Sequence, residues 1–376
     1  MPRAALMVLA VAAATTAIAG SGKPHPHLDP TVVRAGCPAC HAGHGVSRSP
    51  MLPASEKQIC LRCHDDQAGL SQQVARSVVS ADARPPLLGT TLGKASGHPL
   101  SADALPGGGD ATVVCSSCHA SHRSAPGGRG VAGTKRHSPK DERRFEYELC
   151  ESCHGGGSVT RSRIARLVDP ANRSYHPVEA PGSTRSPSVL PSLAGREINC
   201  TDCHGNDDPT GPGGPHASNV PPILRDAYRT VDGAAESENA FALCYRCHDR
   251  KALMERSTFP LHDSHVVGAK TSCATCHDAH GSVSNRALIR FGDSGTGVSP
   301  SVTTGRLAFV SDGSGSGECY INCHGVEHGP KGYGSAPVKT SILQTVSVLP
   351  ATPPLPREPL RPGDRDRPIG RERPKP

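Results

Sequence analysis

Pairs of cysteines that are each followed at once by a histidine recur eight times along this chain of 376 residues. Seven copies have the spacing C-x-x-C-H, and the eighth, at residues 319–324, has a third residue between its cysteines. Two thiols at this spacing match the two vinyl groups of a porphyrin, and the adjacent imidazole falls under the iron, so the motif predicts covalently attached c-type haem. We therefore predict eight haem c groups, held through Cys37, Cys40, Cys60, Cys63, Cys115, Cys118, Cys150, Cys153, Cys200, Cys203, Cys244, Cys247, Cys273, Cys276, Cys319 and Cys323.

The sixteen cysteines could instead form eight disulfides or a set of zinc ribbons. Neither alternative explains why a histidine follows the second cysteine in every copy, and no cysteine lies outside the motifs. The longer spacing of the eighth copy is tolerated by some haem-attachment machinery, but it could also mark a lost site. The motif histidines predicted to bind iron are His41, His64, His119, His154, His204, His248, His277 and His324.

Twelve further histidines lie outside the motifs, more than the eight that are needed if every iron has a second imidazole ligand. Some follow a motif closely, and others lie upstream of a pair of motifs. Because these positions recur along the chain, we interpret them as distal iron ligands rather than as isolated surface histidines. The predicted distal ligands are His27, His44, His98, His122, His176, His216, His265 and His280.

Some of these assignments have close competitors. His25 competes with His27, and His262 competes with His265. His328, four residues beyond the last motif, could serve the last haem. Spacing alone does not determine which distal histidine serves which iron.

The third repeat departs from the others. Asp207 stands where a histidine closely follows the motif elsewhere, so the nearest downstream candidate is His216. His137 has no counterpart in the other repeats, and we predict that it lies on the surface.

The elements that must position these residues are expected to be short. The eight motifs fall into four doublets, which makes the chain an internal repeat, and the intervals rich in glycine, proline and serine predict irregular loops. Short helices are expected before second motifs: Ser55 and Gln58 form a potential capping box ahead of Cys60, and good helix formers fill 141–149 and 235–243. Strands are hard to find. The predicted fold is mostly irregular coil with short α-helices and little β-structure, around a core of stacked haems.

The composition supports a core made largely of cofactor. Hydrophobic residues are 35% of the chain, aromatic residues are 3%, and there is no tryptophan, so an ordinary apolar core would be thin. We expect the chain without haem to be largely unfolded. The net charge of +7 could suggest a nucleic-acid partner, but eight haems would bring up to ~16 propionate charges, so we expect no nucleic-acid binding.

The predicted organisation begins with an export signal, because a basic start, an apolar run and an A-x-A cleavage site occupy the first residues. A retained membrane anchor is the less favoured alternative, and we expect no transmembrane segment in the mature chain. Export fits a haem type that is attached outside the bacterial cytoplasm, so the protein is expected to be periplasmic or extracellular. The predicted segments are 1–22 signal peptide, 23–96, 97–174, 175–256 and 257–335 four di-haem repeats, and 336–376 a disordered tail rich in proline and arginine.

The C-x-x-C-H-x-x-H first motifs, the upstream histidines and the C-x-x-C-H motifs that follow resemble the doubled-CXXCH family of multihaem cytochromes c. The similarity covers roughly residues 24–330. That family includes periplasmic electron shuttles, haem subunits of outer-membrane conduits and extracellular cytochromes of metal-reducing bacteria. The resemblance implies redox proteins as partners, with docking to an outer-membrane conduit as one form.

We expect an electron carrier rather than an enzyme, because iron with an imidazole on both faces has no open position for a substrate. The first alternative is an octahaem oxidoreductase of nitrogen or sulfur oxyanions with one open haem, for which the position of Asp207 is the place to look. The second alternative is a subunit of an extracellular cytochrome filament, formed by self-association.

Overall fold

The computed structural model describes residues 25–45, 51–100, 113–122, 142–155, 164–182, 186–291, 297–311 and 315–334. The chain divides into one unit spanning Met1–Val338 and a second spanning Lys339–Pro376. The second unit, the predicted signal peptide at 1–22 and His137 all lie outside the described residues. Among the described residues, no helix has the length and apolar character needed to cross a membrane.

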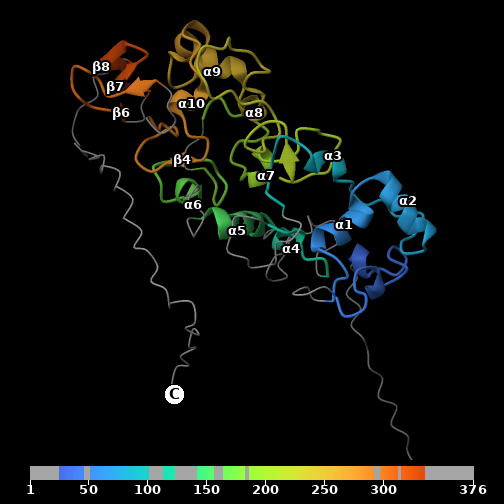
Figure 1. Ribbon diagram of the computed structural model, residues 1–376. Coiled ribbons are helices and arrows are strands. Elements are labelled where there is room, and N and C mark those ends of the chain that lie inside the picture. The colour runs from blue at the N-terminus through green and yellow to red at the C-terminus, as the bar shows by residue number, and fades with distance from the viewer. Residues whose placement is uncertain are drawn as a thin grey trace, which may run out of the picture. The chain divides into compact units, whose positions relative to one another are not determined.

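Short helices separated by irregular chain dominate the first unit (Figure 1), as the sequence predicted. The helical segments are η1 (Pro26–Leu28), η2 (Cys37–Ala39), α1 (Glu56–His64), α2 (Gln67–Ala75), α3 (Gly89–Leu92), α4 (Cys115–Cys118), α5 (Glu142–His154), α6 (Ile164–Val168), α7 (Cys200–Cys203), α8 (Ala242–Tyr245), α9 (Arg250–Arg256), the π-helical η4 (Asp263–Gly268) and α10 (Cys273–Cys276).

The longer helices begin at the caps that their sequences offer. Ser55 and Gln58 form the predicted capping box at the start of α1, with each side chain bonded to the other residue's backbone N–H. Asp66 caps α2 and Asp249 caps α9 in the same way, by accepting a bond from an N–H in the first turn. The helix expected over residues 141–149 is present: α5 begins at Glu142 and continues through the motif to His154.

The helix expected over residues 235–243 is wrong for most of its length, since only Ala242–Tyr245 is helical. Polar side chains account for the difference. The hydroxyl and carbonyl of Ser237 both accept the N–H of Ala240 in a local turn, which competes with helix formation. The Glu236 carboxylate accepts bonds from Tyr245 and Arg250, which holds the incoming chain away from a helical path.

Two very short strand pairs connect neighbouring repeats. β1 (Ser96–Gly97) pairs antiparallel with β3 (Ala217–Ser218), and β2 (Ser174–Tyr175) pairs in the same way with β4 (Gly281–Ser282). β1 lies just before His98 and β3 just after His216, while β2 lies just before His176 and β4 just after His280. These short strands therefore position histidine side chains and do not form a core.

A four-stranded antiparallel sheet, which the sequence analysis did not predict, lies at the end of the described chain. It consists of β5 (Val298–Ser299), β6 (Ala308–Ser311), β7 (Gly317–Cys323) and β8 (Val326–Tyr333), with β7 hydrogen-bonded to the other three. The eighth motif therefore lies on a strand and the turn that follows it. β-Structure is otherwise scarce in the described residues, which confirms the predicted fold class.

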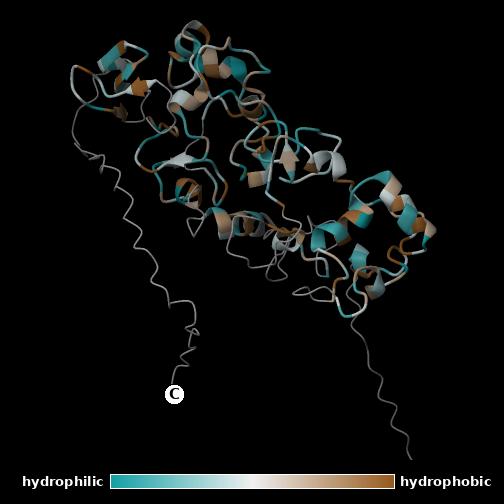
Figure 2. Ribbon diagram, viewed as in Figure 1, coloured by the Kyte–Doolittle hydropathy of each residue, from teal (hydrophilic) through white to brown (hydrophobic). Residues whose placement is uncertain are grey.

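Buried apolar side chains form only small clusters. One contains Leu70, Val79 and Ala83, and another contains Ala240, Phe241 and Val266. The largest side chains that are fully buried are threonines and serines, and Figure 2 shows apolar segments scattered among polar ones instead of gathered in one core. Such a chain lacks the apolar interior of an ordinary domain of this length, as expected if haem fills it.

Candidate haem-binding sites

The seven strict motifs share one backbone conformation, a single helical turn. We number the motifs one to eight in chain order. In the third, the N–H of His119 donates to the carbonyl of Cys115 at 2.9 Å, and the same bond closes the first, fifth, sixth and seventh motifs. The second and fourth motifs lie inside α1 and α5. Residues three and four apart share one side of a helical turn, so both thiols and the imidazole project together.

Among the described residues, eight pairs of histidine rings have their centroids 5.9 to 6.4 Å apart. Seven of these pairs join a motif histidine to a histidine from outside the motifs. In site order they are His41 with His122, His64 with His27, His119 with His216, His154 with His98, His204 with His280, His248 with His176 and His277 with His262. The eighth pair, His265 with His328, contains no motif histidine.

This spacing fits an iron held between two imidazoles. On each side, a metal–imidazole bond of about 2.0 Å and about 1.1 Å from the nitrogen to the ring centre place the two ring centres about 6.2 Å apart. Packed aromatic rings span about 4.5–7 Å, so no single distance is diagnostic. The argument comes from the recurrence of one narrow range at eight places, seven of them at a motif histidine. The ring planes meet at angles from 8° to 76°, which also fits, because two ligands on one axis can rotate about it.

Backbone carbonyls orient many of these rings. A carbonyl only accepts hydrogen bonds, so a ring Nδ1 bonded to one carries the proton and leaves the Nε2 lone pair free for a metal. In the seventh site, for example, His277 Nδ1 donates to the Ala287 carbonyl at 2.7 Å. The other rings held through Nδ1 by a carbonyl are His27, His64, His98, His176, His204, His265 and His328.

Burial keeps several of the imidazoles uncharged. It lowers the pKa of His216, of His248 and of His262 to about 4 in each case, with neighbouring histidines adding to the effect. At neutral pH these rings are therefore unprotonated, which is the form that binds a metal.

The ring pairs link each repeat to the next. The first site of a repeat takes its second histidine from the following repeat, as in the pairs of His41 with His122, His119 with His216 and His204 with His280. The second site of the first three repeats takes it from upstream in the same repeat. Each of the first three repeats therefore depends on the next repeat for one histidine of its first ring pair.

The short strand pairs hold the two kinds of non-motif histidine together. Beside β1 and β3, His98 donates its backbone N–H to the His216 carbonyl at 3.3 Å and its Nδ1 proton to the Pro215 carbonyl at 2.8 Å. Beside β2 and β4, His176 makes the same two bonds, to the carbonyls of His280 and Ala279. The second histidines of two consecutive sites are therefore fixed as one unit.

The structure places most of the predicted distal ligands in ring pairs. These are His27, His98, His122, His176, His216, His265 and His280. His262 and His328, which the sequence offered only as alternatives, are in ring pairs as well. His25 instead accepts a hydrogen bond at its Nδ1 from the backbone N–H of His27.

Two predicted ligands are not in such pairs. His44 stacks on no other histidine among the described residues. Its counterparts His122 and His280 each pair with the first motif histidine of the preceding repeat. His324, the histidine of the eighth motif, instead places its Nε2 2.7 Å from the Asp232 carboxylate.

Asp207 does not occupy a ligand position. Its carboxylate accepts bonds from Lys94 at 2.6 Å and from the backbone and side chain of Asn219. Burial alone would raise the pKa of Asp207, but these donors outweigh it and lower the pKa to about 2. His216 supplies the histidine that the third repeat lacks close to its motif.

Successive motifs have their cysteines near one another. Between doublets, the thiols of the facing first cysteines hydrogen-bond, as Cys60 does with Cys115. Within doublets, the cysteines are close enough to interact electrostatically, as Cys63 does with Cys40. The remaining contacts are Cys150 with Cys200, Cys244 with Cys273, Cys118 with Cys150 and Cys153, Cys203 with Cys247, and Cys276 with Cys319 and Cys323. The eight motifs therefore form one unbroken series in chain order.

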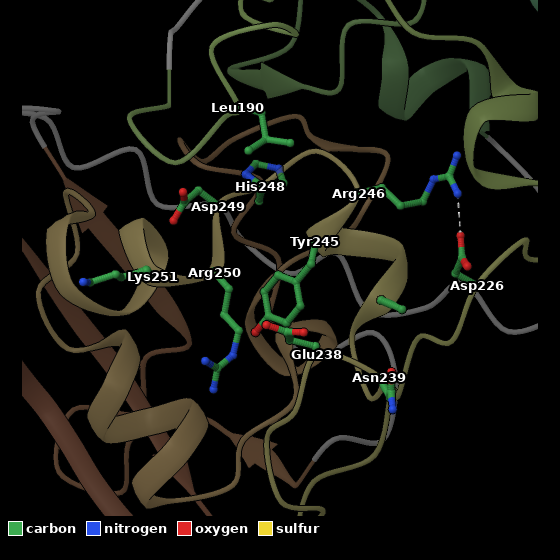
Figure 3. A pocket seen from close by; sticks show the side chains of 11 residues that line it. Leu190, Asp226, Glu238, Asn239, Tyr245, Arg246, His248, Asp249, Arg250 and Lys251 are labelled. Carbon is green, nitrogen blue, oxygen red and sulfur yellow. Dashed lines mark hydrogen bonds and ion pairs between the residues drawn. The ribbon is translucent and has the colours of Figure 1, made fainter.

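A cavity of about 590 Å³ opens at the sixth site (Figure 3). His248 and Leu190 lie on one side of it, and the cationic side chains Arg246 and Arg250 also line it. Arg246 pairs with Asp226 at 2.8 Å. The carboxylates of Asp226, Glu238 and Asp249 line it as well, so the cavity carries both signs of charge.

Comparison with known families agrees with this geometry. Residues 111–287 match the family model described as outer membrane cytochrome MtrC/MtrF-like, domains II/IV. Residues 31–69 match the model of the doubled CXXCH motif. Comparison with curated proteins and with solved structures found no match.

The repeated motif turns, the paired imidazoles and the small number of buried apolar side chains define a c-type cytochrome with several haems. Together with the two family matches, these features identify the chain as a multihaem c-type cytochrome.

Proposed function

We propose that the protein is an exported octahaem cytochrome that passes electrons along its eight sites without substrate chemistry. The observation that supports this most strongly is the set of eight imidazole pairs, because iron with an imidazole on both faces offers no position to a small molecule. The haem groups supply one-electron redox chemistry when bound.

The motif cysteines would hold the haems through thioether bonds, formed when each thiol adds across a vinyl group. The imidazoles of the first seven ring pairs would be the axial ligands of the first seven sites. Carbonyls at Nδ1 fix the ring orientation, as at His98 and His277, so neither oxidation state requires a ligand to move. The four doublets would then act as four di-haem repeats joined through shared ligands.

The order of the sites follows from the cysteine contacts. Each motif has a cysteine near a cysteine of the next motif, so electrons would pass in chain order from the first site to the eighth. Nothing in this arrangement requires a substrate pocket. Asp207, the residue that suggested an open haem, pairs with Lys94, which argues against an oxyanion oxidoreductase at that place.

The location and partners are proposed from the family. The MtrC/MtrF-like segment at 111–287 supports a place at the cell surface or in the periplasm, and the apolar run in residues 1–22 supports export. The partners would be redox proteins, including an outer-membrane conduit to which the cytochrome docks.

The test uses the purified holoprotein. After reduction by dithionite, we expect rapid reoxidation by a soluble one-electron acceptor and by ferric oxide particles, with no absorbance change on adding carbon monoxide. Multiple turnover of nitrite or sulfite, together with carbon monoxide binding to the untreated protein, would instead show an enzyme.

A further inference from the structure

The eighth motif has lost the conformation that the other seven share. Its cysteines lie on β7, an extended strand, rather than on a helical turn. The backbone N–H of His324 donates to the Gly297 carbonyl at 3.2 Å, whereas in the strict motifs the equivalent N–H donates to the first cysteine. The bond that brings the motif histidine back beneath its thiols is therefore missing.

The hairpin explains why. Cys323 pairs with Val326 across β7 and β8, so the connecting loop is His324 and Gly325 alone. Both residues have positive φ, 49° and 84°, as a two-residue hairpin turn of type I′ requires. A histidine at the tip of this turn is displaced from the face that carries the cysteines.

The His324 ring is also engaged through the nitrogen that the other sites leave free. Its Nε2 lies 2.7 Å from Asp232 Oδ2. The other oxygen of Asp232 accepts the N–H of Ser272 and the hydroxyl of Thr275, each at 2.6 Å, so this carboxylate is anchored to the seventh motif. A carboxylate held in this way fixes the His324 ring away from any ring pair.

His328 lies where a ligand of the eighth site should be. Its register partner on β7 is Ile321, the residue midway between Cys319 and Cys323. Residues two apart on a strand share a face, and residues opposite each other across two strands share it too. The register is regular from Ile321 to Cys323, so His328 lies on the same face of the sheet as the Cys323 thiol; it shifts between Ile321 and Cys319.

A second imidazole faces His328. The rings of His265 and His328 are 6.4 Å apart, within the range of the other seven pairs. Each ring donates its Nδ1 proton to a carbonyl, of Leu261 at 2.8 Å and of Val326 at 3.1 Å, which leaves both Nε2 atoms free. His262, one turn before His265 along the chain, faces the seventh motif in the same way, so one helical segment serves two neighbouring sites.

We propose that the iron of the eighth haem is bound by His265 and His328, and that the motif histidine His324 is not its ligand but a partner of Asp232. This rests on the proposed function, since it presumes that Cys319 and Cys323 carry a haem. It means that a haem-attachment motif and its axial ligand are separated here, with the ligand supplied from the opposite strand of a hairpin.

The test compares His328→Ala with His324→Ala, and uses His44→Ala as a control that changes an unpaired histidine. Mass spectrometry of each holoprotein counts the attached haems, and magnetic circular dichroism with carbon monoxide titration counts those that have lost a ligand. In His328→Ala we expect eight attached haems, of which one is high-spin and binds carbon monoxide. In the His324→Ala variant, all of the haems that remain attached should be low-spin, as in the His44→Ala variant.

The outcomes separate this inference from the proposed function. A wild-type mass with fewer than eight haems would contradict the octahaem proposal itself. Eight haems in the wild type, with His328→Ala still fully low-spin or with a high-spin haem in His324→Ala, would overturn only the ligand exchange. If His324→Ala loses one haem during maturation, the His328→Ala spectrum decides alone, because that variant leaves the motif intact.

Discussion

Replacing His216 should destabilise the protein more than replacing His262, although the two imidazoles are alike in their surroundings. Both rings are buried enough for the pKa to fall to about 4, and both face a motif histidine at 5.9 to 6.3 Å. They differ in the length of chain that their iron would close. His216 is separated from His119 by 97 residues, whereas His262 is separated from His277 by 15.

A ligand bond to iron restricts the unfolded chain as a covalent cross-link does. The chain-entropy relation for cross-links scales with the logarithm of loop length, so the longer loop is worth about 1.7 kcal/mol more than the shorter one. We expect His216→Ala to lose that much more free energy of unfolding than His262→Ala. The lost ring burial is nearly matched between the two variants, so it should cancel in the comparison.

The assay is unfolding of each holoprotein in guanidinium chloride, followed by far-ultraviolet circular dichroism. Free imidazole is present throughout, because it restores a second ligand to the iron without restoring the cross-link. Equal losses in the two variants, or a larger loss in His262→Ala, would refute the view that His216 ties the third repeat to the second.

The other predictions concern unpaired groups, a carboxylate and the cofactor. His44→Ala should leave every haem low-spin and the unfolding midpoint within error of the wild type, since its ring faces no other histidine in the described chain; a new high-spin signal would contradict this. The pKa of Asp207 is lowered to about 2 from 3.8, so its carboxylate contributes stability that is present above about pH 4 and is lost as the pH falls toward 2. Asp207→Asn should therefore flatten the acid-unfolding curve in that window without changing the haem count, and an unchanged curve would mean that the pair with Lys94 has no energetic role. Protein produced without haem attachment should lack the helices seen here, because the buried apolar clusters are few; a folded far-ultraviolet spectrum would show that the polypeptide alone forms the core.

The sequence predicts what depends on local spacing. The turn of each strict motif follows from two cysteines and a histidine within five residues, and the start of α1 follows from Ser55 and Gln58. The scarcity of apolar residues predicted the absence of an ordinary core. These features need no knowledge of distant parts of the chain.

What could not be predicted depends on contacts between distant segments. The pairing of His119 with His216 joins two repeats, and the histidine after the motif in one repeat has its partner in the repeat before. That rule becomes visible only with the pairs in place. The hairpin that displaces His324 is equally hidden, because it depends on the register of β7 against β8.

The spacing of His262 and His265 allows two interpretations: the two histidines compete for one iron, or each serves its own. Two histidines three residues apart look like competitors for one iron, yet the helical turn that carries them presents each ring to a different partner, His277 and His328. A count of sites against available histidines in the fourth repeat would have favoured using both.

In the proposed protein, two histidine side chains coordinate each haem iron, one from each face. The most direct test of this coordination is low-temperature electron paramagnetic resonance of the oxidised holoprotein, with spins integrated against a haem count from the mass of the same sample. The account predicts eight haems, all of them low-spin with the g-values of two imidazole ligands. Fewer than eight haems, or a high-spin signal amounting to one haem or more in the wild type, would contradict it.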